Sequence, residues 1–312
     1  SAPLPLFDDL ESTTEIWSWL CTKAHSDYLV FSMDGYFSAD WKDSLRNSNR
    51  KQLIESLNQG SYDLVWAMGT WAGLDLVNND HQVPTMVMST SNPIITNPED
   101  SGYDHVHIRT DPTRVLRQAL LFHDIFNFSR LGLIYENTDY GRAYAYLTEI
   151  KAAAEKAGFE LATCQAPNDM NKHAMAKYSA CARRLAPIVD AFIYDDHSGG
   201  KPSEVKRTLP IFARAGVPTW STRGSSLVQC GVLMSIAKDD FIPVSGFYVD
   251  TMSRILNGTK PRNIKQVFRS GFRLALNLKT ASLINYDPPP NLIGVTDDLF
   301  TTIEPSWEQI ND

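Results

Sequence analysis

The stretch LGLIYENTDYGRAYAYLTEIKAAAEKAGFELATC, residues 131–164, decides the fold class of this chain. It opens with the short apolar run 131–135 and closes with a second strand-like run, 159–164. Between them, residues 141–157 carry an apolar stripe at helical spacing, formed by Ala143, Tyr146, Leu147, Ile150, Ala154 and Ala157. Gly158 follows, where helices commonly end in glycine. A strand, a helix and a strand in this order predict two parallel strands joined by a right-handed crossover.

The same alternation continues on both sides of this unit. Strands are predicted at residues 27–33, 62–68, 84–88, 191–194, 219–221 and 231–236, and helices at residues 49–57, 71–78, 114–126, 172–185, 202–215 and 241–256, with a last apolar segment at 275–283. Residues 62–68 read YDLVWAM, a pattern typical of a strand covered on both faces. Because the rhythm restarts near residues 127–130, we expect an α/β protein with two lobes, each built on a parallel sheet.

The composition is that of an ordinary globular protein. Hydrophobic residues make up 43% and charged residues 21% of the 312 positions, which excludes a fibrous or disordered chain. The formal net charge of −7 argues against a broad nucleic-acid-binding surface. No segment approaches the roughly 18 consecutive apolar residues of a membrane-spanning helix. The length suits two domains better than one.

The four cysteines are Cys21, Cys164, Cys181 and Cys230, and no C-x-x-C pair occurs, so neither a zinc ribbon nor a thioredoxin-like centre is expected. Cys181 and Cys230 lie in apolar surroundings and are predicted to be small buried hydrophobes. The even number permits disulfides, but the spacing assigns no pairing. Ser1 opens a segment without the features of a signal peptide, which leaves a cytosolic protein or a secreted one whose signal has been removed.

Polar loops follow the predicted strands at the edge where open parallel sheets bind ligands. They comprise residues 69–73, 89–93, 136–142, 195–199 and 221–225. These loops are rich in hydroxyl, amide and aromatic side chains, and several lead into a helix whose free N–H groups suit an anion. Each loop alone is also explained by helix capping and turn formation. Five such loops from two lobes favour a ligand-binding cleft between the lobes.

Motifs for catalysis are weak by comparison. The chain contains no G-x-S-x-G, G-x-x-x-x-G-K-[ST] or G-x-G-x-x-G motif. His105 and His107 would share one strand face, but without a third ligand at suitable spacing we expect a structural pair and no metal site. Asp195, Asp196 and His197 would suit acid–base chemistry in an α/β enzyme, although no nucleophile is paired with them in the sequence. We therefore expect no catalytic residue.

Several segments stand in a recognisable order: residues 62–70 (YDLVWAMGT), 83–87 (VPTMV), 91–93 (SNP), 131–135 (LGLIY), 149–159 (EIKAAAEKAGF), 217–220 (VPTW), 255–261 (ILNGTKP) and 276–281 (LNLKTA). In order and spacing they resemble motifs of the solute-binding proteins of ABC transporters, in particular the group with tryptophan- and phenylalanine-binding members. That family's motifs have the forms D-L-I-x-G/A-T, I-P-x-V, T-D-P, I-P-V-F/W, I-L-x-G-x-K-P and L-N-L-K-T-A. The resemblance covers about residues 61–300.

The resemblance implies a periplasmic-binding-protein type I fold, in which two Rossmann-like lobes joined by crossing strands close on a small ligand. The implied lobes are residues 1–127 with about 240–268, and residues 128–239 with about 269–312. It further implies a periplasmic or otherwise extracytoplasmic protein that delivers its solute to an ABC permease, without enzymatic activity or a cofactor. We expect a monomer that does not bind nucleic acid. The alternative is an extracytoplasmic sensor domain of a signalling protein with the same fold.

The chain departs from the family pattern in two places. The family opens with a strand of the K-I-A-I kind, whereas residues 1–7 are short and rich in proline. This leaves the order of strands in the first sheet open. In addition, Asn92 stands where the family's T-D-P turn has an aspartate, which removes a negative charge that would face the ligand.

Carrying the family's hinge-facing loops onto this chain gives the predicted ligand-binding residues. Trp71, Tyr140 and Trp220 would form flat apolar walls, Arg142 and Arg223 would bind a carboxylate, and Asp195 or Asp196 would meet an ammonium group. The full set is Thr70, Trp71, Ala72, Ser89, Thr90, Ser91, Asn92, Asn137, Tyr140, Gly141, Arg142, Asp195, Asp196, His197, Trp220 and Arg223. The alternatives are that Trp220 belongs to the core and that Arg142 points to solvent. The ligand we expect is a small amino-acid-like molecule, aromatic or otherwise apolar, or a carboxylate.

Overall fold

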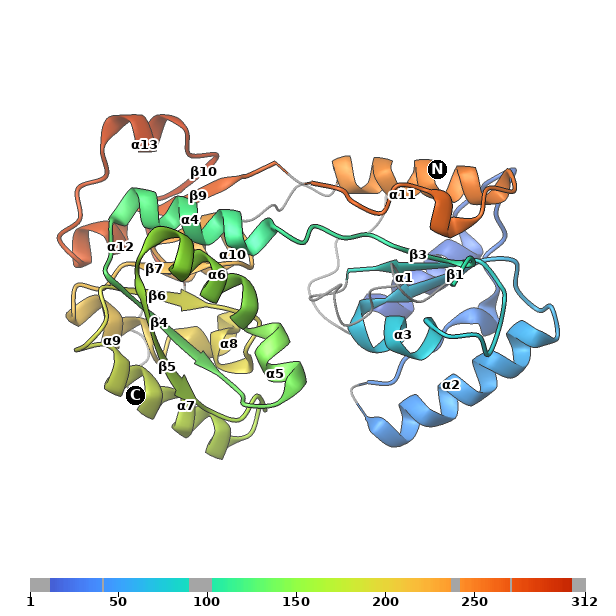
Figure 1. Cartoon of the computed structure of the whole chain (residues 1–312), viewed down its shortest axis with the longest axis horizontal. Coiled ribbons are helices and arrows are strands. Elements are labelled where there is room, and N and C mark those ends of the chain that lie inside the picture. Colours follow the sequence, from blue (N-terminus) through green and yellow to red (C-terminus); the bar gives the residue numbers. More distant parts are fainter. Residues whose placement is uncertain (1–11, 41, 90–102, 237–241, 270, 305–312) are drawn as a thin grey trace. The chain divides into compact units, whose positions relative to one another are not determined.

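The computed structural model describes residues 12–40, 42–89, 103–236, 242–269 and 271–304 (Figure 1). The chain divides into two compact units, Ser1–Val65 with Asn78–Val83, and Trp66–Val77 with Pro84–Asp312. We call the first the N-terminal unit and describe each unit by itself. None of the helices in the described ranges combines the length and apolar composition needed to cross a lipid bilayer.

A seven-stranded sheet dominates the larger unit. Its strands stand in the order β10-β9-β8-β7-β6-β4-β5, with the bounds β4 (Arg130–Tyr135), β5 (Glu160–Gln165), β6 (Ala191–Tyr194), β7 (Thr219–Ser221), β8 (Met234–Ile236), β9 (Leu274–Asn277) and β10 (Asp298–Phe300). Strands β5, β4, β6, β7 and β8 are parallel, as the alternation predicts. Strand β9 departs from the prediction because it runs antiparallel to β8.

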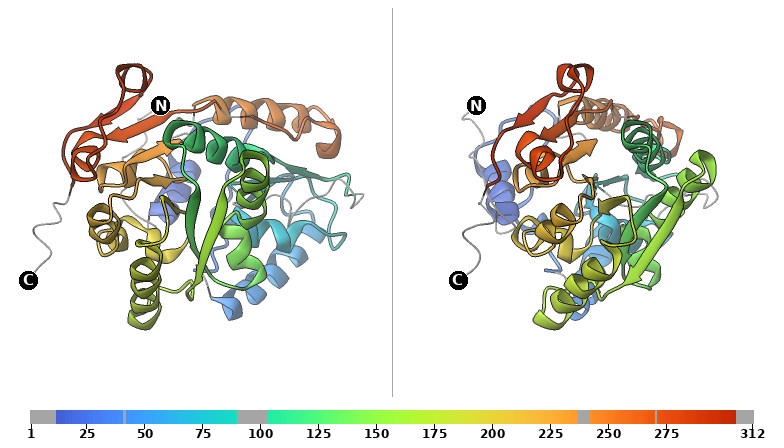
Figure 2. Two further views of the ribbon diagram at one scale, coloured as in Figure 1. Left: turned by 60° about the vertical axis from the view of Figure 1, so that its left-hand side comes forward. Right: turned by 90° about the vertical axis from the view of Figure 1, so that its left-hand side faces the viewer.

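Helices cover both faces of this sheet (Figure 2). One face packs against α4 (Arg114–Phe126) and α6 (Leu147–Ala157), and the other against α7 (Lys172–Leu185) and α9 (Leu209–Arg214). Strand β6 shows how the two cores are separated, since Ile193 faces the α4–α6 core while Phe192 and Tyr194 face the α7–α9 core. Successive side chains of a strand point to opposite faces, so a strand covered on both sides is apolar throughout.

A separate three-stranded sheet contains β1 (Val65–Met68), β2 (Thr85–Met88) and β3 (Val106–Ile108), in that order. Strands β2 and β3 are parallel, and α3 (Gly69–Leu76) leaves the carboxyl end of β1. The later helix α11 (Ile242–Leu256) and the turn η3 (Pro261–Asn263) return to β3. The contacts include a ring contact between His107 and Phe247 of α11 and, just after η3, a hydrogen bond from the Ile108 amide to Gln266 at 2.6 Å.

The N-terminal unit contains α1 (Ser12–Thr22), the turn η1 (Met33–Gly35) and α2 (Asp43–Asn58). The predicted strand at residues 27–33 is wrong, because Met33 begins the turn and the residues before it pair with no strand. Tyr28 and Val30 are 85% and 97% exposed. An extended segment becomes a strand only when a neighbouring strand pairs with its backbone, and no strand among the described residues pairs with this segment.

Two predicted helices are interrupted. Residues 141–157 form α5 (Asp139–Tyr144) and α6, separated by Tyr146 in the left-handed conformation with φ of 51°. Residues 202–215 form α8 (Pro202–Val205) and α9, and residues 275–283 divide into the end of β9 and α12 (Leu278–Leu283). An apolar pattern with helical spacing can continue across a single residue that is not helical. The pattern in the sequence therefore does not reveal such a break.

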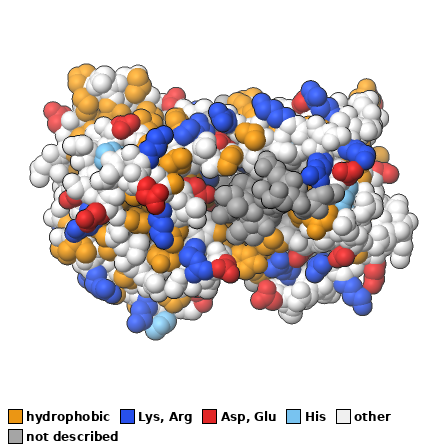
Figure 3. All heavy atoms as spheres, viewed as in Figure 1, with side chains coloured by type: hydrophobic (Ala, Val, Ile, Leu, Met, Phe, Trp, Pro, Cys, Tyr) orange, Lys and Arg blue, Asp and Glu red, His pale blue; other side chains and the backbone are white. Residues whose placement is uncertain are grey.

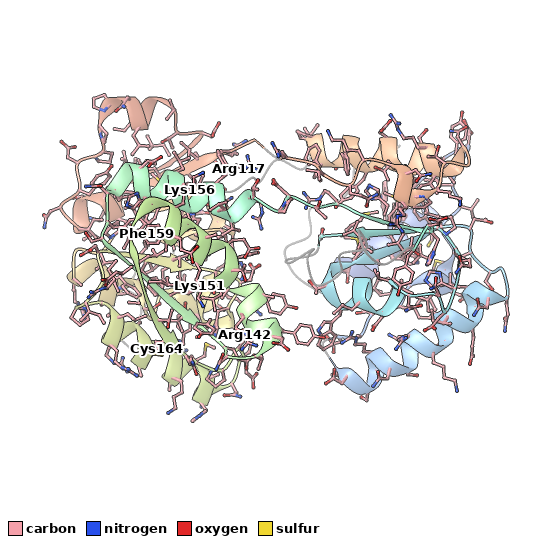
Figure 4. All side chains as sticks on the ribbon, viewed as in Figure 1. Arg117, Arg142, Lys151, Lys156, Phe159 and Cys164 are labelled. Carbon is pink, nitrogen blue, oxygen red and sulfur yellow. A yellow bond between two sulfur atoms is a disulfide. The ribbon has the colours of Figure 1, made fainter. Side chains whose placement is uncertain are left out.

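A disulfide joins Cys164 on β5 to Cys181 on α7, while Cys21 and Cys230 remain thiols (Cys164 is labelled in Figure 4). Cys181 is buried, as predicted, but as half of a disulfide rather than as a thiol. Cys230 is only partly buried. The smaller elements η2 (Ser198–Gly200), α10 (Ser225–Gln229) and α13 (Pro290–Gly294) complete the described part of the larger unit.

Candidate ligand-binding site

Three predicted loops lie at one edge of the seven-stranded sheet. Strands β4, β6 and β7 are parallel and β6 lies between the other two, so their carboxyl ends adjoin. The segments that follow them are residues 136–146, 195–200 and 222–225. On the face of the molecule shown in Figure 3, Lys and Arg side chains are interspersed with those of Asp and Glu.

Tyr146 and Asp196 form the shortest polar contact between these loops. The Tyr146 hydroxyl donates to Asp196 Oδ2 at 2.5 Å and accepts from Arg114 Nη2 at 3.3 Å. The Arg114 guanidinium also lies over the Tyr146 ring, 5.5 Å from its centroid. Burial, together with the Asp196 charge, raises the pKa of Tyr146, so the phenol stays protonated and keeps donating.

Arg223 approaches the other oxygen of the same carboxylate. Its Nε lies 3.8 Å from Asp196 Oδ1, beyond direct hydrogen-bond distance, and the two side chains are 31% and 25% exposed. The Arg223 amide donates to Ser221 Oγ at 3.0 Å. The next residue, Gly224, has φ of 88° and ψ of −168°, a conformation that is open only to glycine. The backbone therefore makes a turn reserved for glycine directly after Arg223, at the start of α10 (Ser225–Gln229).

Asp195 occupies a different environment from its neighbour. It is 1% exposed, Oδ1 accepts from the His197 amide at 3.0 Å, and Oδ2 has no hydrogen-bond partner among the described residues. Burial raises the pKa of Asp195 well above its ordinary range, and the adjacent Asp196 adds to the shift against the His197 hydrogen bond. Two consecutive aspartates that are equivalent in sequence are therefore chemically distinct.

His197 is held inside the loop. Its Nδ1 accepts from the Gly199 amide at 3.0 Å, and its Nε2 donates to the Ala166 carbonyl at 3.2 Å, which identifies the neutral Nε2–H tautomer. The ring packs on Tyr178 with 4.7 Å between centroids. Burial lowers the pKa of His197. At 2% exposure, His197 is buried, and its two ring hydrogen bonds shape the loop.

The loop after β4 is braced by its own side chains. Arg142 Nη1 donates to Asn137 Oδ1 at 2.8 Å and Nη2 pairs with Asp139, so its guanidinium is engaged locally (Figure 4). Thr138 caps α5 by accepting from the Gly141 amide at 2.9 Å. A Cβ on Gly141 would lie 2.3 Å from the Glu136 carbonyl oxygen, so only glycine fits. Tyr140 is 41% exposed and is available as an aromatic surface.

Trp220 lies in the core rather than at the surface of this edge. It is fully buried in the α4–α6 core, with its ring 5.5 Å from that of Phe122. Side chains alternate along β7, so Trp220 points into the helix-covered face. The structure thus supports the alternative reading of this residue, and Trp220 is not exposed to a solute.

The remaining predicted residues follow the strands of the smaller sheet. Thr70, Trp71 and Ala72 lie in the first turn of α3, directly after β1, and Thr70 is buried. Ser89 follows β2 and is exposed, with φ of 54°. Thr90, Ser91 and Asn92 lie outside the described residues. The structure thus places Thr70–Ala72 and Ser89 after the carboxyl ends of neighbouring strands.

His105 and His107 are both buried near β3. His107 Nε2 donates to the Lys265 carbonyl at 3.1 Å, and burial lowers the pKa of His107. No group of three His, Cys, Asp or Glu side chains within the described ranges is arranged to hold a metal ion. His107 therefore serves as a hydrogen-bonded core residue.

No motif in the sequence marks Arg114 or Tyr146 as a site residue. The periodicity places Tyr146 in the apolar stripe of one long helix, where no role for its hydroxyl is predicted. Its left-handed backbone turns the side chain out of register and toward Asp196. Arg114 is the first residue of α4 and carried no motif. The only available signal was the tyrosine itself, a polar-tipped residue in a stripe otherwise made of alanine, leucine and isoleucine.

Comparison with known proteins identifies the fold. No protein-family model matches the chain, and no curated protein matches it. Among solved structures, a conserved domain protein from Vibrio cholerae O1 biovar El Tor superposes with a TM-score of 0.64 at 18% identity, covering 82% of this chain and 83% of that one. The ABC domain in complex with L-Trp from Streptococcus pneumoniae gives 0.62 at 20% identity, covering 81% and 86%.

A third similar structure is the ligand-free, open form of a substrate-binding protein with adhesive properties from Clostridium difficile. It superposes with a TM-score of 0.62 at 14% identity and covers 82% of this chain and 84% of that one. Identities this low establish the fold and not the ligand. The resemblance inferred from sequence motifs is confirmed at that level. The chain has the two-lobe type I periplasmic-binding-protein fold found in ABC-type substrate-binding proteins.

Proposed function

We propose that the protein is an extracytoplasmic solute-binding protein that captures an amino acid, or a closely similar zwitterion, for import through an ABC permease. The observation that carries this proposal is the pair formed by Asp196 and Arg223, which stand 3.8 Å apart and partly exposed at the carboxyl edge of the sheet. A carboxylate and a guanidinium match the ammonium and carboxylate of an amino acid. Edges of this kind are where α/β sheets bind ligands.

The geometry favours Asp196 over Asp195 as the partner of the ammonium group. Asp195 is buried and its raised pKa favours the neutral acid, which attracts a cation poorly. Asp196 retains solvent access, and within the described part of the chain Oδ2 is the oxygen that accepts a short side-chain hydrogen bond. Arg223 is the better candidate for the ligand carboxylate than Arg142, because Arg142 is already engaged by Asn137 and Asp139.

The other predicted ligand contacts are also proposals, for which we state only the kind of group that each residue would offer. Tyr140, at 41% exposure, would supply an aromatic wall for an apolar side chain. Thr70, Trp71 and Ala72 at the start of α3, and Ser89 after β2, would offer hydroxyl, aromatic and amide groups. The division of the chain into two lobes at about residue 127, with a return near residue 240, also stays a prediction.

Two further observations support the extracytoplasmic, non-enzymatic part of the proposal. The Cys164–Cys181 disulfide is typical of proteins that work in an oxidising compartment. The acid–base candidates Asp195 and His197 are 1% and 2% exposed, so neither reaches a solute at the surface of the edge.

Calorimetric titration with the twenty protein amino acids tests the proposal. We expect at least one apolar or aromatic amino acid to bind, and Arg223→Ala to weaken it by about 2 kcal/mol, the lower end for loss of one partner of a buried charge pair, because Arg223 is partly exposed. Arg184→Ala, at an exposed position on α7, is the matched control and should change affinity less than twofold. Failure of every amino acid to bind the unaltered protein would contradict the proposal.

A further inference from the structure

We propose that Tyr146 and Arg114 are positioning residues that hold one oxygen of Asp196, so that its second oxygen stays available to the ligand's ammonium group. This inference rests on the proposed function. Neither residue would touch the ligand. Their contribution would be to keep Asp196 and Arg223 apart at the 3.8 Å separation seen here.

Tyr146 is placed to act through Asp196 and not on a ligand. It is 4% exposed, and its hydroxyl is occupied on one side by Asp196 Oδ2 at 2.5 Å and on the other by Arg114 Nη2 at 3.3 Å. A guanidinium can only donate, so the hydroxyl oxygen accepts from Arg114 and its hydrogen is directed to Asp196. The hydrogen bond to Asp196 therefore has a single possible polarity.

The backbone conformation of Tyr146 directs its side chain toward Asp196. A bulky residue with positive φ is uncommon and is held in that conformation only when the surrounding structure requires it. Here the left-handed residue, with φ of 51° and ψ of 36°, separates α5 from α6. Without that interruption the helix would continue and carry the side chain elsewhere on its surface. The contact with Asp196 gives this conformation a role beyond packing.

Arg114 orients the tyrosine from the start of α4. Its guanidinium covers the Tyr146 ring at 5.5 Å from the centroid, a cation–π arrangement that restrains the ring. Its position is itself restrained, because the preceding segment is tied to α4 by the ion pair of Asp111 with Arg117, at 3.0 Å (Arg117 is labelled in Figure 4). Arg114 thus acts on Asp196 through Tyr146.

Asp196 needs such a restraint because the hydrogen bonds within its loop hold the backbone and the neighbouring side chains but not the Asp196 carboxylate. The neighbouring residues Asp195 and His197 are anchored by internal hydrogen bonds, but the Asp196 carboxylate accepts a direct side-chain hydrogen bond only from Tyr146 among the described residues. If this bond is lost, the carboxylate is free to turn toward Arg223 and form a direct ion pair. That pair would occupy the carboxylate that we assign to the ligand's ammonium group, while the remaining N–H groups of Arg223 stay available to the ligand's carboxylate.

A double-mutant cycle with calorimetric titration tests this inference. The ligand is whichever of L-tryptophan, L-phenylalanine and L-leucine binds the unaltered protein best, and the variants are Tyr146→Phe, Asp196→Asn and both together. We expect Tyr146→Phe to weaken binding about tenfold in the unaltered protein and less than twofold in the Asp196→Asn background. A purely structural tyrosine would give the same loss in both backgrounds, which would overturn the inference.

A second arm uses the acids that lack the amino group: 3-(indol-3-yl)propanoate, 3-phenylpropanoate and 4-methylpentanoate. Tyr146→Phe should weaken the amino acid about tenfold but its matching acid less than twofold. Tyr194→Phe is the matched control, because it removes another buried hydroxyl, bonded to Thr208 at 2.9 Å, and should affect both ligands equally. Equal losses of affinity for the two ligands in Tyr146→Phe would overturn this inference and leave the proposed function standing. Failure of all twenty amino acids to bind the unaltered protein would overturn both.

Discussion

The N-terminal unit and the seven-stranded sheet differ in how completely they bury apolar side chains. Among the described residues of the N-terminal unit, only Leu57 and His81 are buried. In β6, by contrast, every residue is buried, and the sheet has a core on each face. Both regions contain apolar segments with a strand pattern, so such a segment by itself does not account for the difference.

The difference shows what an apolar strand pattern depends on. Residues 27–33 read DYLVFSM and residues 191–194 read AFIY, and both patterns predict a strand. Strand β6 forms because β4 and β7 pair with it on either side and helices cover both faces. Residues 27–33 have no such neighbours within the described ranges, and Val30 is left 97% exposed. Local pattern is therefore necessary for a strand and insufficient without a partner.

The largest effect we expect comes from truncating the core of the sheet. Phe192 is fully buried and stacks on Phe212 with 4.0 Å between ring centroids. Phe192→Ala should lower the free energy of unfolding by about 3–5 kcal/mol, because it removes buried surface and leaves a cavity. Tyr28→Ala, which alters an exposed ring in the N-terminal unit, should cost less than about 0.5 kcal/mol. Denaturant unfolding measures both changes. Comparable losses of unfolding free energy in the two variants would contradict the proposed difference in burial between the two regions.

An intermediate effect is expected from the disulfide of the larger unit. Replacing both Cys164 and Cys181 by alanine should cost about 2–4 kcal/mol, since a bridge between residues 17 apart restricts the unfolded chain. Cys21→Ala, in the N-terminal unit, is the control and should leave the denaturation midpoint nearly unchanged. Thiol alkylation followed by mass spectrometry checks the pairing beforehand. Labelling of Cys164 or Cys181 in the native protein without reductant would count against it.

The smallest effect concerns pH and arises from a buried histidine. Burial lowers the pKa of His107 in the folded protein, so the unfolded chain binds the proton more readily. The stability that this group contributes is present above the unfolded pKa of about 6.5 and is lost as the pH falls below it. Unfolding midpoints should therefore decrease between pH 7 and pH 5.

A pair of variants assigns that pH dependence to one region. His107→Gln should make the decrease in midpoint between pH 7 and pH 5 shallower. His25→Gln, at an exposed position in the N-terminal unit, should leave the decrease unchanged. A decrease that His107→Gln does not alter would assign the pH dependence to other groups, such as His197.

Much of the fold could be predicted from local pattern. The bounds of α4, α7, β6 and β7 agree with the periodicity, because helices and buried strands place apolar residues at regular intervals. The prediction was poorest where one residue or one pairing decides the outcome. The single helix predicted over residues 141–157 is broken at Tyr146, and the antiparallel direction of β9 was not foreseen.

The candidate site was predictable only in outline. The sequence alone determined that this is an α/β chain, that polar loops follow its strands, and that Asp195, Asp196 and Arg223 lie in such loops. Only the tertiary structure shows that Asp195 is buried whereas Asp196 is partly exposed, and that Trp220 lies in the core. It alone also shows that Tyr146 and Arg114 lie beside Asp196. The physical reason is the strand order β7-β6-β4, which sets residues far apart in sequence side by side at one edge. Burial and hydrogen-bond partners then decide the chemistry of each side chain, and neither is encoded in spacing along the chain.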